Sequence, residues 1–276
     1  TVGLRDYCSK SGLSNVVLGL SGGIDSAVAA CVASRALGPE NVLGISIPSR
    51  HSSQHSIDDA KFTADALGCE YMVIDLEDLH QAGEKTLENE LNSGDPVAGE
   101  NIQARLRGLI VMGIANARGA MAIATGNKSE LAQGYCTLYG DMAGGYAPIG
   151  DLYKTEVYAV AKAINLEAKS LGKAPPISES TLTKPPSAEL APDQIDQDTL
   201  PEYELLDKIL RCHIEDLMDE SAIVSNGFEE SIVKDVLSRL ERNEHKRWQM
   251  PPAPRVSERA FGQGWRQPLA AKRAWK

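Results

Sequence analysis

Residues 18–28 bring together groups that could hold phosphate. They read LGLSGGIDSAV, so an apolar run ends at Leu20, two glycines follow and a helix-like segment begins. Adjacent glycines let the backbone turn tightly and bring its N–H groups close to an anion, which the N-terminus of a helix also favours. The hydroxyls of Ser21 and Ser26 add donors. The pattern therefore predicts an anion-binding loop, whereas a lone Gly-Gly pair would indicate an ordinary turn.

Asp25 changes the chemistry of this loop. The phosphate-loop pattern GxxxxGK[ST] would place a lysine beside the final hydroxyl, and this chain has Asp25 there. A carboxylate next to phosphates requires a cation between them, so Asp25 is a candidate Mg²⁺ ligand. The plainer interpretation, an ordinary helix-start residue, is less favoured because the full SGGxDS pattern lies between a strand and a helix.

A repeated scaffold must position these residues. Short Val- and Ile-rich runs that predict buried parallel strands lie at residues 15–20, 41–47, 70–74 and 121–125. Segments with helical spacing lie between them at residues 24–37, 56–67 and 101–118. Strands alternating with helices predict an α/β fold with a doubly wound parallel sheet, Rossmann-like, whose ligands bind at the carboxyl ends of the strands.

The pattern changes after Asp151. Residues 154–164 predict a helix, and residues 173–201 are rich in Pro, Ser, Thr and Asp, which indicates a long loop. We expect residues 173–198 to form a lid. Helices are predicted at 202–219 and 228–243, and residues 250–276 form a basic tail with several prolines. We expect all of residues 1–276 to form one domain.

Composition excludes some functions. The chain has 276 residues and a net charge of −10, which disfavours a general nucleic-acid or membrane-surface binder. The five cysteines form no CxxC pair, so we expect reduced thiols rather than a zinc site or disulfides. No apolar run approaches the roughly 20 residues of a membrane span, and we expect a cytoplasmic protein. The first residue is Thr1, which suggests either a chain cut from a longer one or the removal of its first residues.

The loop SGGIDS resembles the pyrophosphate-binding loop of the N-type ATP pyrophosphatases, which have the adenine nucleotide alpha hydrolase fold. These enzymes cleave ATP between its α and β phosphates and leave AMP on a substrate. The resemblance implies that the loop holds the phosphates that become pyrophosphate. The implied ATP-binding residues are Gly19, Leu20, Ser21, Gly22, Gly23, Ile24, Asp25 and Ser26.

Later segments narrow the resemblance to NAD synthetases, and in particular to the synthetase domain of those that use glutamine. The segments are ENIQARLRG at 100–108, ATGNKSE at 124–130, LYGDMAGG at 138–145, GDLYKT at 150–155, PSAEL at 186–190 and EHKR at 244–247. The resemblance implies ATP contacts from Thr125, Lys154 and Ser187, and a Mg²⁺ ligand or dinucleotide contact from Glu130. It implies further contacts to the dinucleotide from Arg105, His245 and Lys246.

Each of these residues also has an ordinary interpretation. Arg105 could be a solvated arginine on an amphipathic helix, and Glu130 a surface charge. His245 and Lys246 could complement the dipole at a helix end. Lys154 is different, because a lysine that opens a helix opposes the dipole unless it has an anionic partner. The order and spacing of the segments, rather than any single one, favour the functional interpretation.

The implied reaction is a ligation. The carboxylate of nicotinic acid adenine dinucleotide attacks the α-phosphate of ATP, pyrophosphate leaves, and ammonia converts the acyl adenylate to NAD and AMP. Asp25, Glu130 and Lys154 are the implied catalytic residues, and Asp25 and Glu130 the implied Mg²⁺ ligands. The resemblance also implies a homodimer and a glutaminase that supplies ammonia from outside this chain.

Two departures and two alternatives remain. Leu138 and Gly145 stand where the short, ammonia-using members have a lysine and an aspartate, so dinucleotide contacts from those positions do not carry over. One alternative is another amide-forming ATP pyrophosphatase such as a GMP synthetase. The other is a non-catalytic ATP-binding module, which would leave the two carboxylates unexplained.

Overall fold

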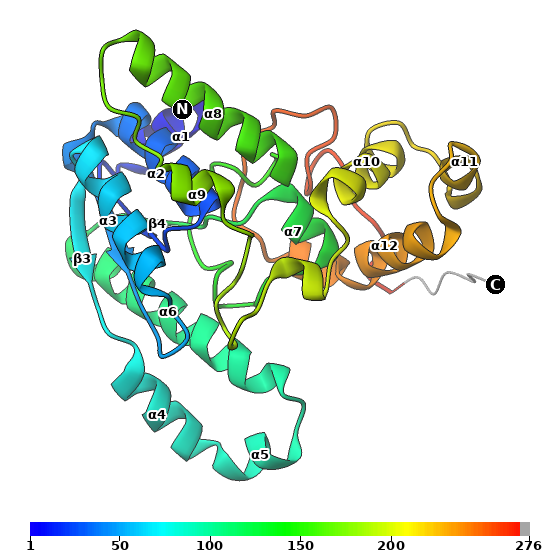
Figure 1. The fold of residues 1–276 in the computed structure, drawn as a ribbon, viewed down its shortest axis with the longest axis horizontal. Coiled ribbons are helices and arrows are strands. Elements are labelled where there is room, and N and C mark those ends of the chain that lie inside the picture. The colour runs from blue at the N-terminus through cyan, green and yellow to red at the C-terminus, as the bar shows by residue number, and fades with distance from the viewer. Residues whose placement is uncertain (271–276) are drawn as a thin grey trace.

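The computed structural model describes residues 1–270 (Figure 1). Its described sheet is parallel throughout. The described strands are β1 (Val16–Gly19), β2 (Val42–Ser46), β3 (Glu70–Val73) and β4 (Met121–Ile123), in the order β3-β2-β1-β4. Val16 of β1 is aligned with Val42 of β2 on one side and with Met121 of β4 on the other. Each strand lies within a predicted run, so the predicted α/β fold class is confirmed.

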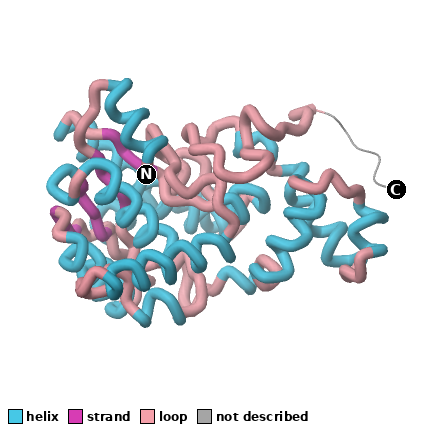
Figure 2. The backbone as a smooth tube through the Cα atoms, turned by 90° about the horizontal axis from the view of Figure 1, so that it is seen from above, coloured by secondary structure: helices cyan, strands magenta, loops and turns pink. Residues whose placement is uncertain are grey.

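Helices cover both faces of the sheet because successive residues of a buried strand point to opposite sides. Val16 and Leu18 pack with α1 (Val2–Ser11), α2 (Ile24–Leu37) and α3 (Gln54–Leu67). Val17 points the other way and packs with α6 (Val97–Arg118). Figure 2 shows the strands gathered in one half of the molecule, with loops between them and a second, helical half.

The remaining described helices follow the chain order. They are α4 (Glu77–Thr86), α5 (Glu88–Ser93), α7 (Lys128–Gln133), α8 (Lys154–Ser170), α9 (Glu179–Thr183), α10 (Tyr203–Ile214), α11 (Glu220–Ser225), α12 (Glu230–Arg242) and α13 (Glu244–Arg247), with 3-10 turns at Pro39–Asn41 and Asp196–Asp198. The predicted helix 202–219 is wrong at its C-terminal end. Asp219 instead caps α11, because its carboxylate accepts the N–H of Ala222 (2.8 Å).

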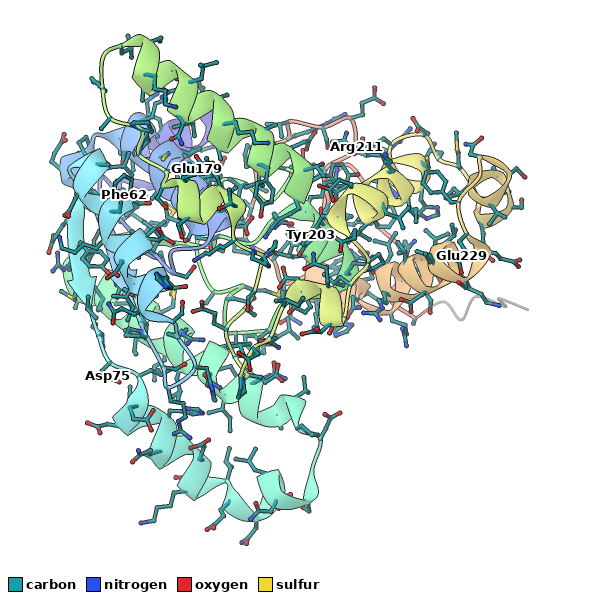
Figure 3. The ribbon with its side chains drawn as sticks, in the orientation of Figure 1. Phe62, Asp75, Glu179, Tyr203, Arg211 and Glu229 are labelled. Carbon is teal, nitrogen blue, oxygen red and sulfur yellow. The ribbon has the colours of Figure 1, made fainter. Side chains whose placement is uncertain are left out.

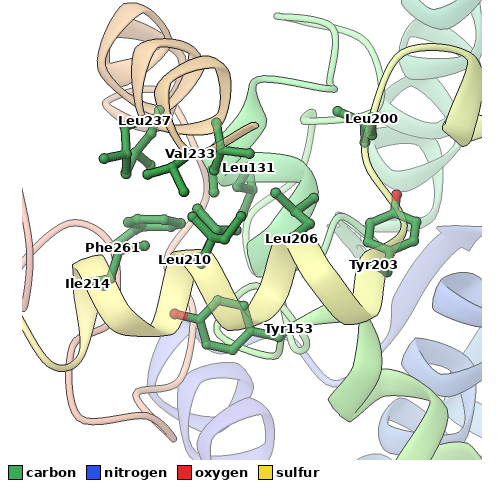
Figure 4. Packing of buried hydrophobic residues seen from close by; sticks show 14 of the residues in the cluster. Leu131, Tyr153, Leu200, Tyr203, Leu206, Leu210, Ile214, Val233, Leu237 and Phe261 are labelled. Carbon is green, nitrogen blue, oxygen red and sulfur yellow. The ribbon is translucent and has the colours of Figure 1, made fainter. Parts of the chain in front are cut away.

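A second hydrophobic core joins α7, α10 and α12 to part of the tail. Leu206 and Leu210 of α10 point toward Leu131 of α7 and Val233 of α12, as Figure 4 shows. Tyr153, which precedes α8, lies on the opposite side of α10 in the same view. α8 packs against α2 through a separate core. These contacts hold α7 and α8, which carry predicted site residues, between the sheet and the helical half.

The segment predicted as a loop contains a short helix. α9 begins after Ser178, whose hydroxyl accepts the N–H of Thr181 (3.0 Å). The tail that follows α13 is held by Asp151, whose carboxylate accepts the N–H groups of Val256 and Ser257. Residues 271–276 of the predicted tail lie outside the described part of the chain.

Candidate active site

The carboxyl ends of β1, β2 and β4 open onto a cavity of about 300 Å³. β1 lies between β2 and β4 in the sheet, so the chain crosses from one side of β1 to the other, which is where ligands bind in open α/β sheets. Most of the predicted site residues line the cavity. These are Gly19, Leu20, Ser21, Gly23, Ile24, Asp25, Ser26, Thr125, Glu130, Lys154 and Ser187.

The loop after β1 is fixed by its own hydroxyls. Ser26 Oγ donates to the carbonyl of Gly23 (2.9 Å) and accepts the N–H of Ser21 (3.2 Å). Gly22 has a φ of +79°, and a Cβ there would lie 2.1 Å from the carbonyl oxygen of Ser56. Only glycine fits both the conformation and the space. Gly22 itself does not line the cavity; it lets the loop lie against α3.

The N-terminus of α2 follows this loop directly. Its N-cap residue, Gly23, provides no side-chain hydrogen bond, and Ile24 and Asp25 of the first turn line the cavity. The first N–H groups of a helix have no partner within the helix and carry the positive end of its dipole. The arrangement is suited to binding an anion such as phosphate.

Asp25, Lys154 and Glu130 form one charged cluster at the cavity wall. Lys154 Nζ lies 2.5 Å from Asp25 Oδ2 and 3.1 Å from Glu130 Oε1. Asn127 binds both acids: its amide donates to Asp25 Oδ1 (2.9 Å), and its backbone N–H donates to Glu130 Oε2 (3.1 Å). Three segments far apart in the sequence therefore converge at one point. Among the described residues, no group of three or more His, Cys, Asp or Glu is placed to hold a metal ion.

Burial and the neighbouring charges act in opposite directions on the pKa values of this cluster. Desolvation raises the pKa of Glu130 to about 8, although the nearby Lys154 ammonium opposes the shift. Burial alone would lower the pKa of Lys154, but the charges of Asp25 and Glu130 outweigh burial and raise it. Lys154 therefore stays a cation, and its single charge can balance one of the two carboxylates.

The 173–198 segment lies against the cavity and contributes a strap from Lys184 to Leu190. Glu189 in this strap accepts hydrogen bonds from the hydroxyls of Ser56 (2.5 Å) and Ser53 (3.2 Å) at the start of α3. Lys184 Nζ donates to Ser56 Oγ (3.1 Å). Polar contacts between side chains thus fasten the strap to the start of α3, beside the cavity.

Asp196, near the end of the same segment, adds a further carboxylate to the cavity wall. Its side chain is almost fully buried, and burial raises its pKa. Its Oδ2 accepts a hydrogen bond from the hydroxyl of Tyr203 (2.7 Å). Tyr203 lies at the N-terminal end of α10 (Figure 3). The helical half of the molecule therefore reaches the cavity through this pair.

Comparison with known proteins places this site in a family. The family model described as NAD synthase matches residues 1–251. The chain belongs to the NAD synthase family. A glutamine-dependent NAD(+) synthetase of Thermotoga maritima is 46% identical over 269 residues, which are 97% of this chain and 46% of that protein. One of Rhodobacter capsulatus is 48% identical over 272 residues, which are 97% of this chain and 49% of that protein.

Solved structures of an NAD synthetase and of an NMN synthetase have the same architecture. The NH3-dependent NAD synthetase of Campylobacter jejuni is 29% identical with a TM-score of 0.69, over 92% of this chain and 94% of that one. The NMN synthetase of Francisella tularensis is 27% identical with a TM-score of 0.73, over 88% of this chain and 90% of that one. The chain spans about half the length of the curated relatives it matches.

Some residues that the resemblance to NAD synthases singled out do not line the cavity in this chain. Arg105 is exposed and donates to the carbonyl of Leu138 (3.2 Å). Lys246 donates to the carbonyls of Gly134 and Cys136 (both 2.7 Å), and the ring of His245 lies beside the carbonyl of Arg242. In the described chain these three residues bind backbone carbonyls outside the cavity.

Other cavity residues were missed from the sequence. Arg107, two positions after Arg105 in the same NAD synthase motif, lines the cavity and donates to the carbonyl of Ile47 (3.1 Å). Further titratable ones include Tyr135, Asp141, Tyr158, Lys184, Glu189 and Asp196. The available signals were the position of Arg107 inside a recognised motif and the position of Glu189 inside the PSAEL segment.

Proposed function

We propose that this chain amidates the nicotinate carboxylate of nicotinic acid adenine dinucleotide with ATP and ammonia. A carboxylate oxygen bonds to the α-phosphorus as the bond to pyrophosphate breaks, and the ammonia nitrogen then bonds to the acyl carbon as AMP leaves. The observation that carries this proposal is the Asp25–Lys154–Glu130 cluster beside an uncapped helix N-terminus. Both features suit a triphosphate that must be oriented and neutralised.

The proposed roles follow from position. The loop from Gly19 to Ser26 and Thr125 would hold the phosphates of ATP through N–H groups and hydroxyls. Lys154 would offset the charge that develops on the departing pyrophosphate. The nicotinate carboxylate is itself the nucleophile, so the reaction requires no nucleophilic side chain. Ser187, in the strap, would close the ATP site from the opposite side.

Asp25 and Glu130 would hold Mg²⁺ together with phosphate oxygens. Mg²⁺ takes oxygen ligands and is commonly bound by one or two carboxylates plus substrate phosphates, which fits this donor set. When bound, the ion would neutralise phosphate charge. Lys154 lies between the two carboxylates, so we expect its ammonium to shift toward the phosphates when the cation enters.

The strap supports the proposal that residues 173–198 keep water out of the cavity during the reaction. An acyl adenylate exposed to solvent would be hydrolysed before ammonia reached it. We propose that residues 173–198 act as a lid over the cavity, fastened to Ser56 of α3 by Glu189 and Lys184. The exclusion of water would be its contribution to the reaction.

The dinucleotide would extend beyond the cavity. Arg105, His245 and Lys246 lie outside it, and we propose that they contact the distal part of the substrate near the contact between two copies of the chain in a homodimer. We further propose that the chain acts as one synthetase domain in the cytoplasm. No helix within residues 1–270 is long and apolar enough to cross a membrane.

Glutamine-dependent relatives extend beyond the matched region. We propose that a glutaminase outside this chain supplies the ammonia in the cell. The purified chain should therefore form NAD and AMP in equal amounts from ATP, Mg²⁺, nicotinic acid adenine dinucleotide and ammonium, and form none with glutamine. Both products would be quantified by chromatography.

Two substrate controls sharpen this test. Nicotinic acid mononucleotide replaces the dinucleotide, because one structural neighbour is an NMN synthetase. Xanthosine monophosphate tests a GMP synthetase activity. If turnover is faster with either control than with the dinucleotide, the proposed substrate is wrong. If folded chain binds ATP but releases no AMP with any substrate, the chain is a non-catalytic ATP-binding module.

A further inference from the structure

Asp207 is a buried carboxylate of α10 that does not line the cavity but contacts α7 and α8, two of the helices that do. Its side chain is almost completely buried. Oδ1 accepts a hydrogen bond from Ser129 Oγ of α7 (2.5 Å). Oδ2 accepts the backbone N–H and the hydroxyl of Thr155 of α8 (2.9 and 2.8 Å). One side chain from the helical half therefore holds the first turns of two other helices.

The start of α8 depends on these partners. The residue before this helix, Tyr153, makes no side-chain cap for it. The N–H of Lys154 instead donates to Ser129 Oγ (2.9 Å), and the N–H of Thr155 donates to Asp207. Two donors without partners inside the helix are thereby satisfied by side chains from α7 and α10. The Asp207 carboxylate also lies at the positive end of the α8 dipole, which Lys154 would otherwise make more positive.

The same contacts fix the cluster at the cavity. Ser129 precedes Glu130 in the chain, and Thr155 follows Lys154. Holding Ser129 and Thr155 on one carboxylate sets the separation between the backbones of Glu130 and Lys154. We infer that Asp207 is a positioning residue for the Asp25–Lys154–Glu130 cluster, an inference that rests on the proposed function for its kinetic test.

α10 does not depend on Asp207 for its place in the fold. Leu206 and Leu210 are buried in the core with α7 and α12 (Figure 4). Arg211, farther along α10 in Figure 3, forms an ion pair with Glu156 of α8 (2.5 Å). The substitution Asp207→Asn keeps the side-chain shape, so we expect the variant to fold.

The expected defect is in geometry. In Asp207→Asn, the amide oxygen can still accept from Thr155, but the amide nitrogen then faces Ser129 Oγ. In the wild-type chain, Ser129 Oγ donates its hydrogen to Asp207. The Ser129 hydroxyl must turn, and its bond to the N–H of Lys154 is disturbed. We expect kcat for NAD formation to fall by about tenfold or more, because small misplacements of reacting groups carry such penalties. ATP affinity should fall in parallel, because Lys154 moves relative to the phosphates.

A stability-matched control separates positioning from general destabilisation. Ile209→Val shortens a fully buried side chain on the same helix without touching Ser129 or Thr155. Ile209→Val should have a melting temperature similar to that of Asp207→Asn and should retain the wild-type kcat. Ser129→Ala should reproduce the loss in kcat, and the double variant with Asp207→Asn should lose little more than either alone, since both remove one linkage. Ser129→Ala also provides the test if Asp207→Asn does not fold.

Three results would overturn the inference: a kcat of Asp207→Asn within twofold of wild type, an equal loss in Ile209→Val, or additive losses in the double variant. ATP binding is measured by calorimetry in the same series to separate this inference from the proposed reaction. A wild-type chain that binds ATP but forms no NAD contradicts the reaction alone. In that case, ATP affinity about tenfold weaker in Asp207→Asn upholds the inference, and unchanged affinity overturns it.

Discussion

Replacing Lys154 by methionine tests the electrostatic account of the site. At an effective dielectric constant of about 20, its contacts of 2.5 Å with Asp25 and 3.1 Å with Glu130 correspond to gross attractions of about 7 and about 5 kcal/mol. Desolvation of the buried charges offsets much of this attraction. Removing one member of a buried pair costs about 3–5 kcal/mol. Because Glu130 can take up a proton, we expect a loss near the lower end, about 3 kcal/mol.

The variant should respond to Mg²⁺ in a way that the wild type does not. Without the ammonium, Asp25 and Glu130 form a pair of unneutralised carboxylates that a divalent cation can occupy. Millimolar Mg²⁺ without ATP should therefore recover part of the lost stability, measured by urea unfolding. NAD formation should remain lower by about 10²–10³-fold, because the cation does not replace a donor to the departing pyrophosphate.

A matched control completes this experiment. Lys162 lies on the same helix and is exposed, so Lys162→Met should change neither stability nor turnover. The reasoning is refuted if Lys154→Met unfolds within about 1 kcal/mol of wild type and shows no response to Mg²⁺, since an exposed pair contributes only that much.

Gly22→Ala should destabilise the fold and weaken ATP binding, because it combines a positive φ with a Cβ placed 2.1 Å from the Ser56 carbonyl oxygen. Gly68 has a similar φ, but a Cβ there would enter open space. Calorimetry of Gly68→Ala should therefore show a loss of only about 1–2 kcal/mol in the free energy of unfolding, with unchanged ATP affinity. Equal effects of the two substitutions would contradict this explanation. Glu130→Gln should fold but lose most turnover. The raised pKa of Glu130 means that its contribution to stability is present below its ordinary value of 4.5 and is lost as pH rises toward about 8. Wild-type stability should therefore fall more than that of Glu130→Gln between about pH 5 and pH 8, and parallel urea profiles would show that the pKa is not raised.

Local patterns predicted the scaffold and the first loop. Short apolar runs indicated all the described strands, because buried parallel strands need apolar residues on both faces. The predicted boundaries of residues 24–37 match α2, since the glycines before it and Gly38 after it are local signals. The lysine that opens α8 implied an anionic partner, and the structure places Asp25 and Glu130 beside Lys154.

Long-range contacts were beyond such patterns. Asp196, Asp207 and Glu189 resemble ordinary charged residues in the sequence, and their partners lie in segments that only the folded chain brings together. The choice between Arg105 and Arg107 fails for a different reason. Residues two positions apart on a helix point to different sides, and the motif does not indicate which side faces the cavity.

The charges of the Asp25–Lys154–Glu130 cluster support the proposal that a cation accompanies ATP. Asp25 and Glu130, when ionised, exceed the single charge of Lys154, so the ligand-free cluster is negative or neutral toward a triphosphate. A bound Mg²⁺ would reverse that sign at the point where the loop after β1 and the N-terminus of α2 present their N–H groups. The N–H groups that position the phosphates and the cation that reverses the charge of the cluster would then act on the same phosphates. The effect depends on short separations between three side chains, which is why a buried contact outside the cavity, that of Asp207, bears on the chemistry within it.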